Sequence, residues 1–145
     1  MNDVNRKAGV PATVAYRLGT LGAQAADRFA ARVEEHGVKP KHVGLMAALD
    51  AGESASQLEL ATRLGVAPSL IVALADHLER LGAVDRARDP GDRRRQVLSL
   101  TDRGRELLAT CAAAAHALDD ELTAALSPAD RAELTRLLGL LAAGG

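Results

Sequence analysis

The chain has 145 residues, of which 48% are apolar and 26% are charged, and its formal net charge at pH 7 is −1. This balance excludes a chain that is disordered as a whole and favours a single globular domain over residues 1–145. Aromatic residues make up 1% of the chain, which argues against aromatic cages and against stacking platforms for single-stranded nucleic acid.

The sequence gives no sign of a membrane segment or of a disulfide framework. No apolar run approaches the roughly 18 residues of a membrane helix, and residues 1–7 lead into no apolar signal sequence. The one cysteine, Cys111, can form neither an internal disulfide nor a cysteine-based zinc site. We therefore expect a cytoplasmic protein without membrane contact. The four histidines show no paired metal-ligand spacing, so no metal site is predicted, and no cofactor is expected either.

Helical patterns fill the first third of the chain. Pro11 opens a helix that runs to about His36, with apolar residues at helical spacing, and Gly37 is a suitable left-handed cap. A shorter helix is predicted from Pro40 to Asp50, where proline occupies the first turn.

Two further short helices follow across a tight turn. Ser56 and Glu59 match a capping box, in which the serine oxygen and the glutamate carboxylate each accept from a backbone amide, and they predict a helix that ends at Leu64. After the turn at Gly65 and Val66, a helix is predicted over 68–81.

The periodicity then changes from helical to extended. Residues 84–88 and 96–100 flank the turn-forming segment 89–92, which predicts a β-hairpin, and no other strand is predicted. A long helix is expected from about Asp102 to Leu126, and a last helix restarts after Ser127.

Charge is concentrated around this hairpin. Residues 80–105 carry eight arginines and four acidic residues, whereas the following residues are acidic. Two short helices followed at once by an arginine-rich hairpin are the parts of a winged helix-turn-helix, in which a helix fits the B-DNA major groove and the hairpin reaches the backbone or the minor groove.

Residues 56–106 resemble the DNA-binding region of the MarR family of bacterial transcription regulators. The strongest part of the match is the wing tip, Asp89-Pro90-Gly91-Asp92-Arg93-Arg94, followed by Leu100-Thr101-Asp102-Arg103-Gly104. The order and length of the other helices extend the resemblance over nearly the whole chain. It implies a mainly α fold with a small β-hairpin wing, a winged helix-turn-helix lobe at about 40–104, and dimerisation helices at about 11–36 and 105–143.

The resemblance also implies a function: a transcriptional regulator, expected to be a repressor, that binds double-stranded DNA as a homodimer on a palindromic operator. Arg94 matches the arginine that the family inserts into the minor groove, and Asp92 is expected to orient it by a charge-assisted hydrogen bond. The predicted DNA-binding residues are Ser69, Leu70, Ala73, His77, Arg86, Arg88, Asp92, Arg93, Arg94 and Arg95.

Two further sites are implied by the resemblance alone. Candidate dimer-interface residues are Val14, Leu18, Leu134, Leu137, Leu138 and Leu141. A small anionic or phenolic effector is expected to release the DNA from a cleft between the dimerisation helices and the lobe, near Tyr16, Arg17, His36, His42 and Met46.

Alternatives remain. Val72 and Ala73 stand where many relatives have polar residues, so the winged fold could serve as a protein-interaction module without specific DNA binding. Cys111 could act as a redox switch, although its place among alanines favours a buried, inert thiol. The chain has no nucleophile elbow, phosphate-binding glycine loop or zinc-protease motif, so an enzyme is not predicted.

Overall fold

A computed structural model describes residues 9–52 and 54–145, so segment 1–7, which bears on the predicted localisation, lies outside the described residues. The chain forms two compact units. We call Ala26–Ala114 the central lobe, and the residues up to Ala25 together with Ala115–Gly145 the terminal unit. Because these boundaries fall inside two long helices, the central lobe is larger than the predicted lobe at 40–104. That the whole chain behaves as one domain stays a prediction.

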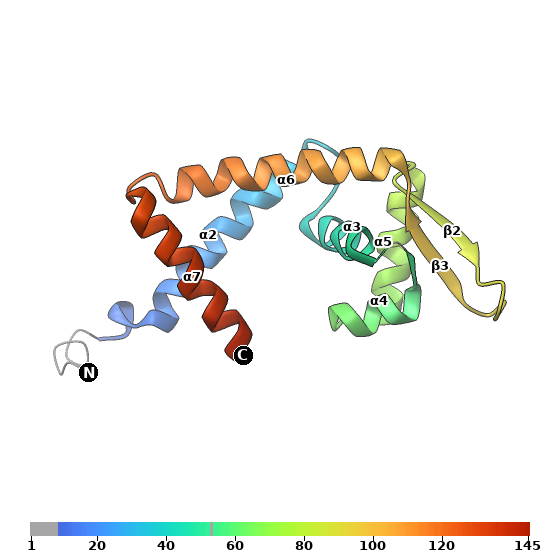
Figure 1. Cartoon of the computed structure of the whole chain (residues 1–145), viewed down its shortest axis with the longest axis horizontal. Helices are drawn as coiled ribbons and strands as arrows, with labels where there is room; N and C mark the ends of the chain where they lie inside the picture. Colours follow the sequence, from blue (N-terminus) through green and yellow to red (C-terminus); the bar gives the residue numbers. More distant parts are fainter. Residues whose placement is uncertain (1–8, 53) are drawn as a thin grey trace. The chain divides into compact units, whose positions relative to one another are not determined.

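The described part of the chain is mainly helical with a small sheet, which confirms the predicted fold class (Figure 1). In chain order the elements are η1 (Val10–Ala12), α2 (Val14–Glu34), α3 (Pro40–Gly52), β1 (Ser54–Ser56), α4 (Gln57–Leu64), α5 (Pro68–Arg80), β2 (Val84–Arg88), β3 (Gln96–Leu100), α6 (Asp102–Leu122) and α7 (Pro128–Gly144).

Two predicted helix boundaries differ from the structure. The expected first helix is divided at Thr13, between a short 3-10 helix and α2. The helix predicted to reach Leu126 ends at Leu122, because the chain continues in turns in which the Leu126 amide donates to the Thr123 carbonyl. Apolar residues continue at helical spacing through these turns, so the sequence pattern does not show where the helix ends.

The sheet has the order β1-β3-β2, and both pairs are antiparallel. In the predicted hairpin, Val84 lies opposite Leu100 and Arg88 lies opposite Gln96. The prediction of only two strands is wrong, because β1 pairs with the other edge of β3. A strand of three residues is too short to show the alternation by which strands are recognised.

The helix-turn-helix follows from local signals. The Ser56 hydroxyl accepts from the Glu59 amide at 3.1 Å and caps α4. Gly65 ends that helix at φ 66°, a left-handed conformation that costs glycine little, and Pro68 begins α5. The other half of the predicted capping box is replaced, since the Glu59 carboxylate pairs with Arg95 of the wing.

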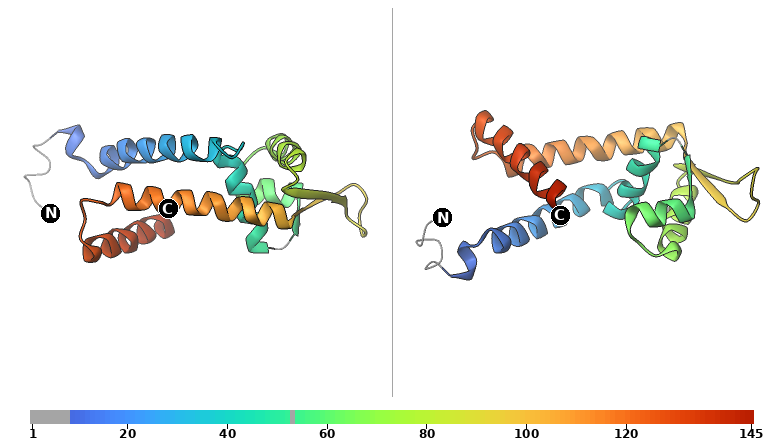
Figure 2. Two further views of the ribbon diagram at one scale, coloured as in Figure 1. Left: turned by 90° about the horizontal axis from the view of Figure 1, so that it is seen from above. Right: turned by 60° about the horizontal axis from the view of Figure 1, so that its bottom comes forward.

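The core of the central lobe is aliphatic. Its buried side chains come from every element between the end of α2 and the middle of α6. The fully buried ones include Val33, Leu45, Met46, Ile71, Leu78, Leu98 and Cys111. Around this core, the β2–β3 hairpin extends beyond the helices of the lobe, as the further views in Figure 2 show.

No single helix among the described residues is long and apolar enough to cross a membrane. Only α4 and α5 taken together reach the required length and composition, and they are bent by 115°. The apolar faces of these two helices pack in the core of the lobe, where Leu60, Ile71 and Leu78 are buried.

Candidate nucleic-acid interface

Helix α5 has one face in the core and one face in solvent. Its buried residues are Ile71, Leu74, Ala75 and Leu78. On a helix of 3.6 residues per turn, the opposite face consists of Ser69, Val72, Ala73, Asp76 and Arg80. This outward face mixes a hydroxyl, two small apolar side chains, an acid and a base, which are groups that can contact base edges or phosphates.

Two predicted base-contacting residues, Leu70 and His77, lie at the border of that face and are turned toward α3. Leu70 packs against the core. The His77 Nε2 lies 2.6 Å from the Gly37 carbonyl, so this nitrogen carries the proton and donates it, and the ring centroid lies 4.5 Å from that of His42. These contacts leave Ser69 and Ala73 as the predicted residues that point outward.

The tip of the wing is closed by its own hydrogen bonds. The Asp89 amide donates to the Arg95 carbonyl at 2.9 Å, and the Arg95 amide donates to the Asp92 carbonyl at 3.0 Å. Asp92 was expected to bond the Arg94 side chain, but its Oδ1 accepts from the Arg94 backbone amide at 3.1 Å. Asp92 therefore fixes the backbone from which Arg94 projects, as aspartates commonly do in turns.

The predicted phosphate-binding arginines fall into two groups. Arg86 is 19% exposed, and its Nη1 donates to Asp76 Oδ1 at 2.8 Å while its Nη2 lies 3.4 Å from the Val72 carbonyl. Arg95 pairs with Glu59. Arg86 and Arg95 therefore both have acidic partners within the lobe, and their predicted role as phosphate contacts would require them to exchange or share those partners.

The second group, Arg88, Arg93 and Arg94, is exposed, and none forms an ion pair with the part of the chain that the structure describes. Arg94 borders a hollow of about 220 Å³ together with Gln57, Pro68 and Val72. A wing arginine and the outward face of α5 thus share one surface. Gln57 was not predicted, although its position directly after the helix-capping serine could have suggested it.

A larger pocket, of about 850 Å³, lies between the start of α3 and α5 within the central lobe. Its walls include Lys39, Lys41, His42, Leu70 and His77. His42 is 8% exposed, and its Nδ1 accepts from the Lys39 amide at 2.9 Å. Burial, then the charges of His77 and Lys39, lower the pKa of His42 to about 4.

We expect this histidine to make the lobe sensitive to acid. The unfolded chain protonates His42 near pH 6.5 but the folded lobe only near pH 4, so its contribution to stability is lost as the pH falls through this window. The loss reaches about 2 kcal/mol at pH 5. His42→Gln keeps an acceptor for the Lys39 amide but does not titrate, so denaturant unfolding at pH 7 and pH 5 should show a smaller loss in this variant. Equal losses in the two proteins would contradict the expectation.

The other candidate effector residues are not gathered around this pocket. Met46 is fully buried in the core, and His36 is exposed at the end of α2. Tyr16 and Arg17 belong to the terminal unit, where Tyr16 is 45% exposed. Of the five predicted residues, only His42 lines the pocket of the central lobe.

Cys111 is fully buried, as the sequence favours, and burial raises the pKa of its thiol. Reactive cysteines need access to solvent and a lowered pKa. The redox alternative therefore has no support from the geometry of this residue.

The terminal unit exposes an apolar stripe. The six predicted interface residues, Val14, Leu18, Leu134, Leu137, Leu138 and Leu141, are between 38% and 64% exposed. Those on α7 recur at i, i+3, i+4 and i+7 and therefore share one face. An exposed apolar helix face such as that of α7 is typical of a protein–protein interface.

Comparisons with known proteins agree with this geometry. Residues 36–95 match the family model described as the MarR family. The HTH-type transcriptional repressor MdtR of Bacillus subtilis is 38% identical over 72 residues, which cover 50% of this chain and 46% of MdtR. A relative from Thauera aromatica, whose name concerns transcriptional regulation of the hcr operon, is 35% identical over 102 residues. That match covers 70% of this chain and 61% of the relative, so the chain spans less than two thirds of either curated protein.

Among solved structures, the transcriptional repressor CouR bound to a 23-mer DNA duplex superposes with a TM-score of 0.78. The two sequences are 32% identical, and the match covers 90% of this chain and 92% of CouR.

Proposed function

The chain belongs to the MarR family, and from this we propose that it is a transcriptional regulator that represses by binding double-stranded DNA at a palindromic operator as a homodimer. Its curated relatives are regulators of transcription and not enzymes. The CouR complex with a DNA duplex supports DNA as the partner.

One observation carries the proposal: Arg94 of the wing and Val72 on the outward face of α5 border the same hollow. A major-groove helix and a cationic hairpin must be neighbours if both are to contact one duplex. We propose that Ser69, Val72 and Ala73 face the major groove and that Arg94 enters the minor groove. The side chains of Val72 and Ala73 at the centre of this face offer no hydrogen bonds. Much of the recognition therefore comes from their contacts with thymine methyl groups and from the sequence-dependent shape of the DNA. Arg88 and Arg93 contact phosphates.

The dimer supplies the symmetry of the operator. A twofold axis would place two recognition helices one DNA turn, about 34 Å, apart and so select inverted repeats. The apolar stripe on the terminal unit supports such an interface, since its leucines are exposed in the single chain.

A small anionic or phenolic effector is the proposed control. The pocket of about 850 Å³ supports this, because Leu70 and His77 of α5 form one wall and Lys39 and Lys41 supply positive charge nearby. A ligand there touches the recognition helix directly. Because coupling between sites is reciprocal, operator DNA would weaken effector binding by the same factor as effector weakens DNA binding.

The test is a titration of wild type and Arg94→Ala with an operator duplex recovered by random-oligonucleotide selection, at several salt concentrations. Wild-type affinity should fall steeply as salt rises, because binding releases phosphate counterions. Arg94→Ala should bind more weakly by more than about 1 kcal/mol while it folds and dimerises normally. Arg28→Ala is the matched control, because it removes an exposed charge of the same sign from α2.

A protein-interaction module, the alternative favoured by Val72 and Ala73, makes the opposite prediction. Such a module would recover no inverted repeat and would show no salt-dependent binding to duplex DNA. Unchanged affinity in Arg94→Ala, beside salt-dependent binding of wild type, would remove the minor-groove role and leave DNA binding itself intact.

A further inference from the structure

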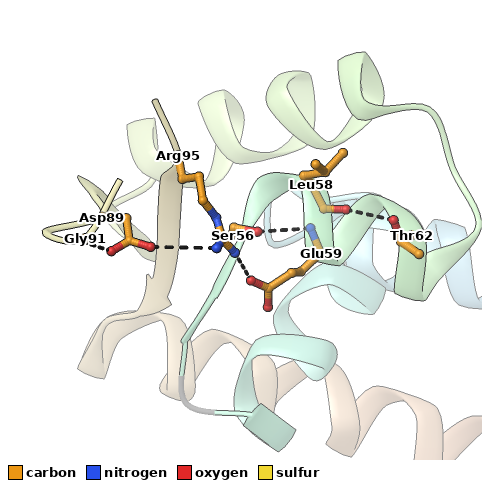
Figure 3. Close-up of polar contacts among 7 residues, drawn as sticks. All are labelled: Ser56, Leu58, Glu59, Thr62, Asp89, Gly91 and Arg95. Atoms are coloured by element: carbon orange, nitrogen blue, oxygen red, sulfur yellow. Dashed lines mark hydrogen bonds and ion pairs between the residues drawn. The ribbon is translucent and has the colours of Figure 1, made fainter. Parts of the chain in front are cut away.

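Arg95, in the tip segment of the wing just before β3, lies between two acidic side chains, as Figure 3 shows. Its guanidinium pairs with the Glu59 carboxylate of α4, and its Nη1 lies 4.0 Å from Asp89 Oδ2. Glu59 is itself fixed, because its amide donates to the capping Ser56 hydroxyl at 3.1 Å. The pair thus joins the wing to the first turn of α4, across 36 positions of sequence.

The backbone around Arg95 couples the Arg95–Glu59 ion pair, called here the tie, to the rest of the wing tip. The amide and the carbonyl of Arg95 both form hydrogen bonds within the turn, with Asp92 and Asp89. Arg94 is the preceding residue, and its amide is held by Asp92. A displacement of Arg95 from Glu59 would therefore shift the backbone from which Arg94 reaches the hollow beside α5.

A DNA phosphate can also compete with the Glu59 carboxylate for the Arg95 guanidinium. The side chains of Arg95 and Glu59 are 44% and 50% exposed, and exposed ion pairs of this kind add little to the stability of a fold. A DNA phosphate offers a guanidinium the same bidentate oxygen geometry as a carboxylate. Arg95 can therefore exchange one partner for the other without unfolding the lobe.

We propose that Glu59 is a specificity-determining positioning residue for DNA binding: it keeps Arg95 from the phosphates of non-operator DNA and fixes the wing so that Arg94 stays beside α5. This inference rests on the proposed function. Without the tie, Arg95 gains a phosphate contact on any sequence, whereas the specific contact of Arg94 becomes less well placed. Glu59 therefore acts by limiting non-specific affinity.

The experiment compares full-length wild type, Glu59→Ala and Glu59→Gln on an operator duplex and on a duplex of unrelated sequence. On the unrelated duplex, Glu59→Ala should bind roughly fivefold to tenfold more tightly near 0.1 M salt, and the slope of log affinity against log salt should steepen by about 0.9 for each Arg95 that reaches a phosphate. The ratio of operator to non-operator affinity should fall. Glu59→Gln, which loses the charge but keeps an acceptor, should show the same changes in smaller measure.

Two controls separate the tie from charge alone. Asp85→Ala removes an exposed negative charge from β2 and leaves Glu59 in place, so it should steepen the slope less than Glu59→Ala. In an Arg95→Ala background, Glu59→Ala should have little further effect, because no arginine remains to be released. A full Glu59→Ala effect in that background would overturn the inference.

The inference and the proposed function fail in different ways. If wild type binds no duplex, the proposed function is wrong and the inference falls with it. If wild type binds DNA with a steep salt dependence, but Glu59→Ala matches it in slope and in operator preference, only the role of Glu59 is overturned. Thermal unfolding of each variant verifies that the compared proteins are folded.

Discussion

Replacing Gly104 with alanine is expected to destabilise the central lobe by about 3 kcal/mol, at the upper end of what overpacking costs. A Cβ at this position would lie 2.0 Å from the Ala83 carbonyl oxygen and 2.9 Å from its carbonyl carbon, and 2.9 Å from Leu100 Cδ2. Two of these three atoms belong to the backbone, which cannot move aside as the end of a flexible side chain can.

Hydrogen bonds hold both sides of this close approach. The Ala83 carbonyl accepts from the Thr101 amide at 3.1 Å, and the Gly104 amide donates to the Thr101 hydroxyl at 3.0 Å. The same hydroxyl donates to the Gly82 carbonyl at 2.6 Å. Relief of the clash must therefore break the cap of α6 or separate α6 from the start of β2.

Denaturant unfolding of Gly104→Ala checks this result. Gly44→Ala is the matched control, because a Cβ there meets nothing within 4 Å in the interior of α3. Alanine at such a helical position stabilises by about 0.5 to 1 kcal/mol, so the same substitution should have opposite signs at the two glycines. A Gly104→Ala protein within about 1 kcal/mol of wild type would show that the strand and helix can separate at little cost.

Gly104 also illustrates what the sequence could reveal. The resemblance marked Leu-Thr-x-x-Gly as part of the family pattern, but only the structure gives a reason for the glycine, in the approach of α6 to Ala83. The hairpin was predicted at its observed bounds because a turn segment between two extended runs is a local signal. β1 was missed because it depends on pairing with a strand about 40 positions away.

The charge pairs of the wing were beyond sequence reasoning for the same physical reason. Arg86 and Arg95 lie in one arginine-rich run with Arg93 and Arg94, and nothing local distinguishes them. Their partners are 10 and 36 positions away, on α5 and α4. Which arginines remain free for DNA is thus decided by tertiary contacts, and this is the step at which a count of local charge ceases to predict a binding surface.

The second large effect is expected at the apolar stripe of the terminal unit. Leu138→Glu should convert the proposed dimer into monomers and lower operator affinity by about 100-fold or more, because two linked half-site contacts become independent events. Leu138 is 43% exposed in the single chain, so a glutamate there is tolerated in a monomer, whereas an apolar interface would have to bury its charge without a partner.

Sedimentation and duplex titration of the same preparation measure the two parts of this prediction. Leu140→Glu is the control, since Leu140 is 59% exposed on α7 but lies roughly a third of a turn from the stripe, and it should leave the dimer intact. If Leu138→Glu stays dimeric and binds the operator as wild type does, the stripe is not the interface. If it becomes monomeric and keeps full operator affinity, one lobe is sufficient for recognition, and the requirement for a palindromic site is removed.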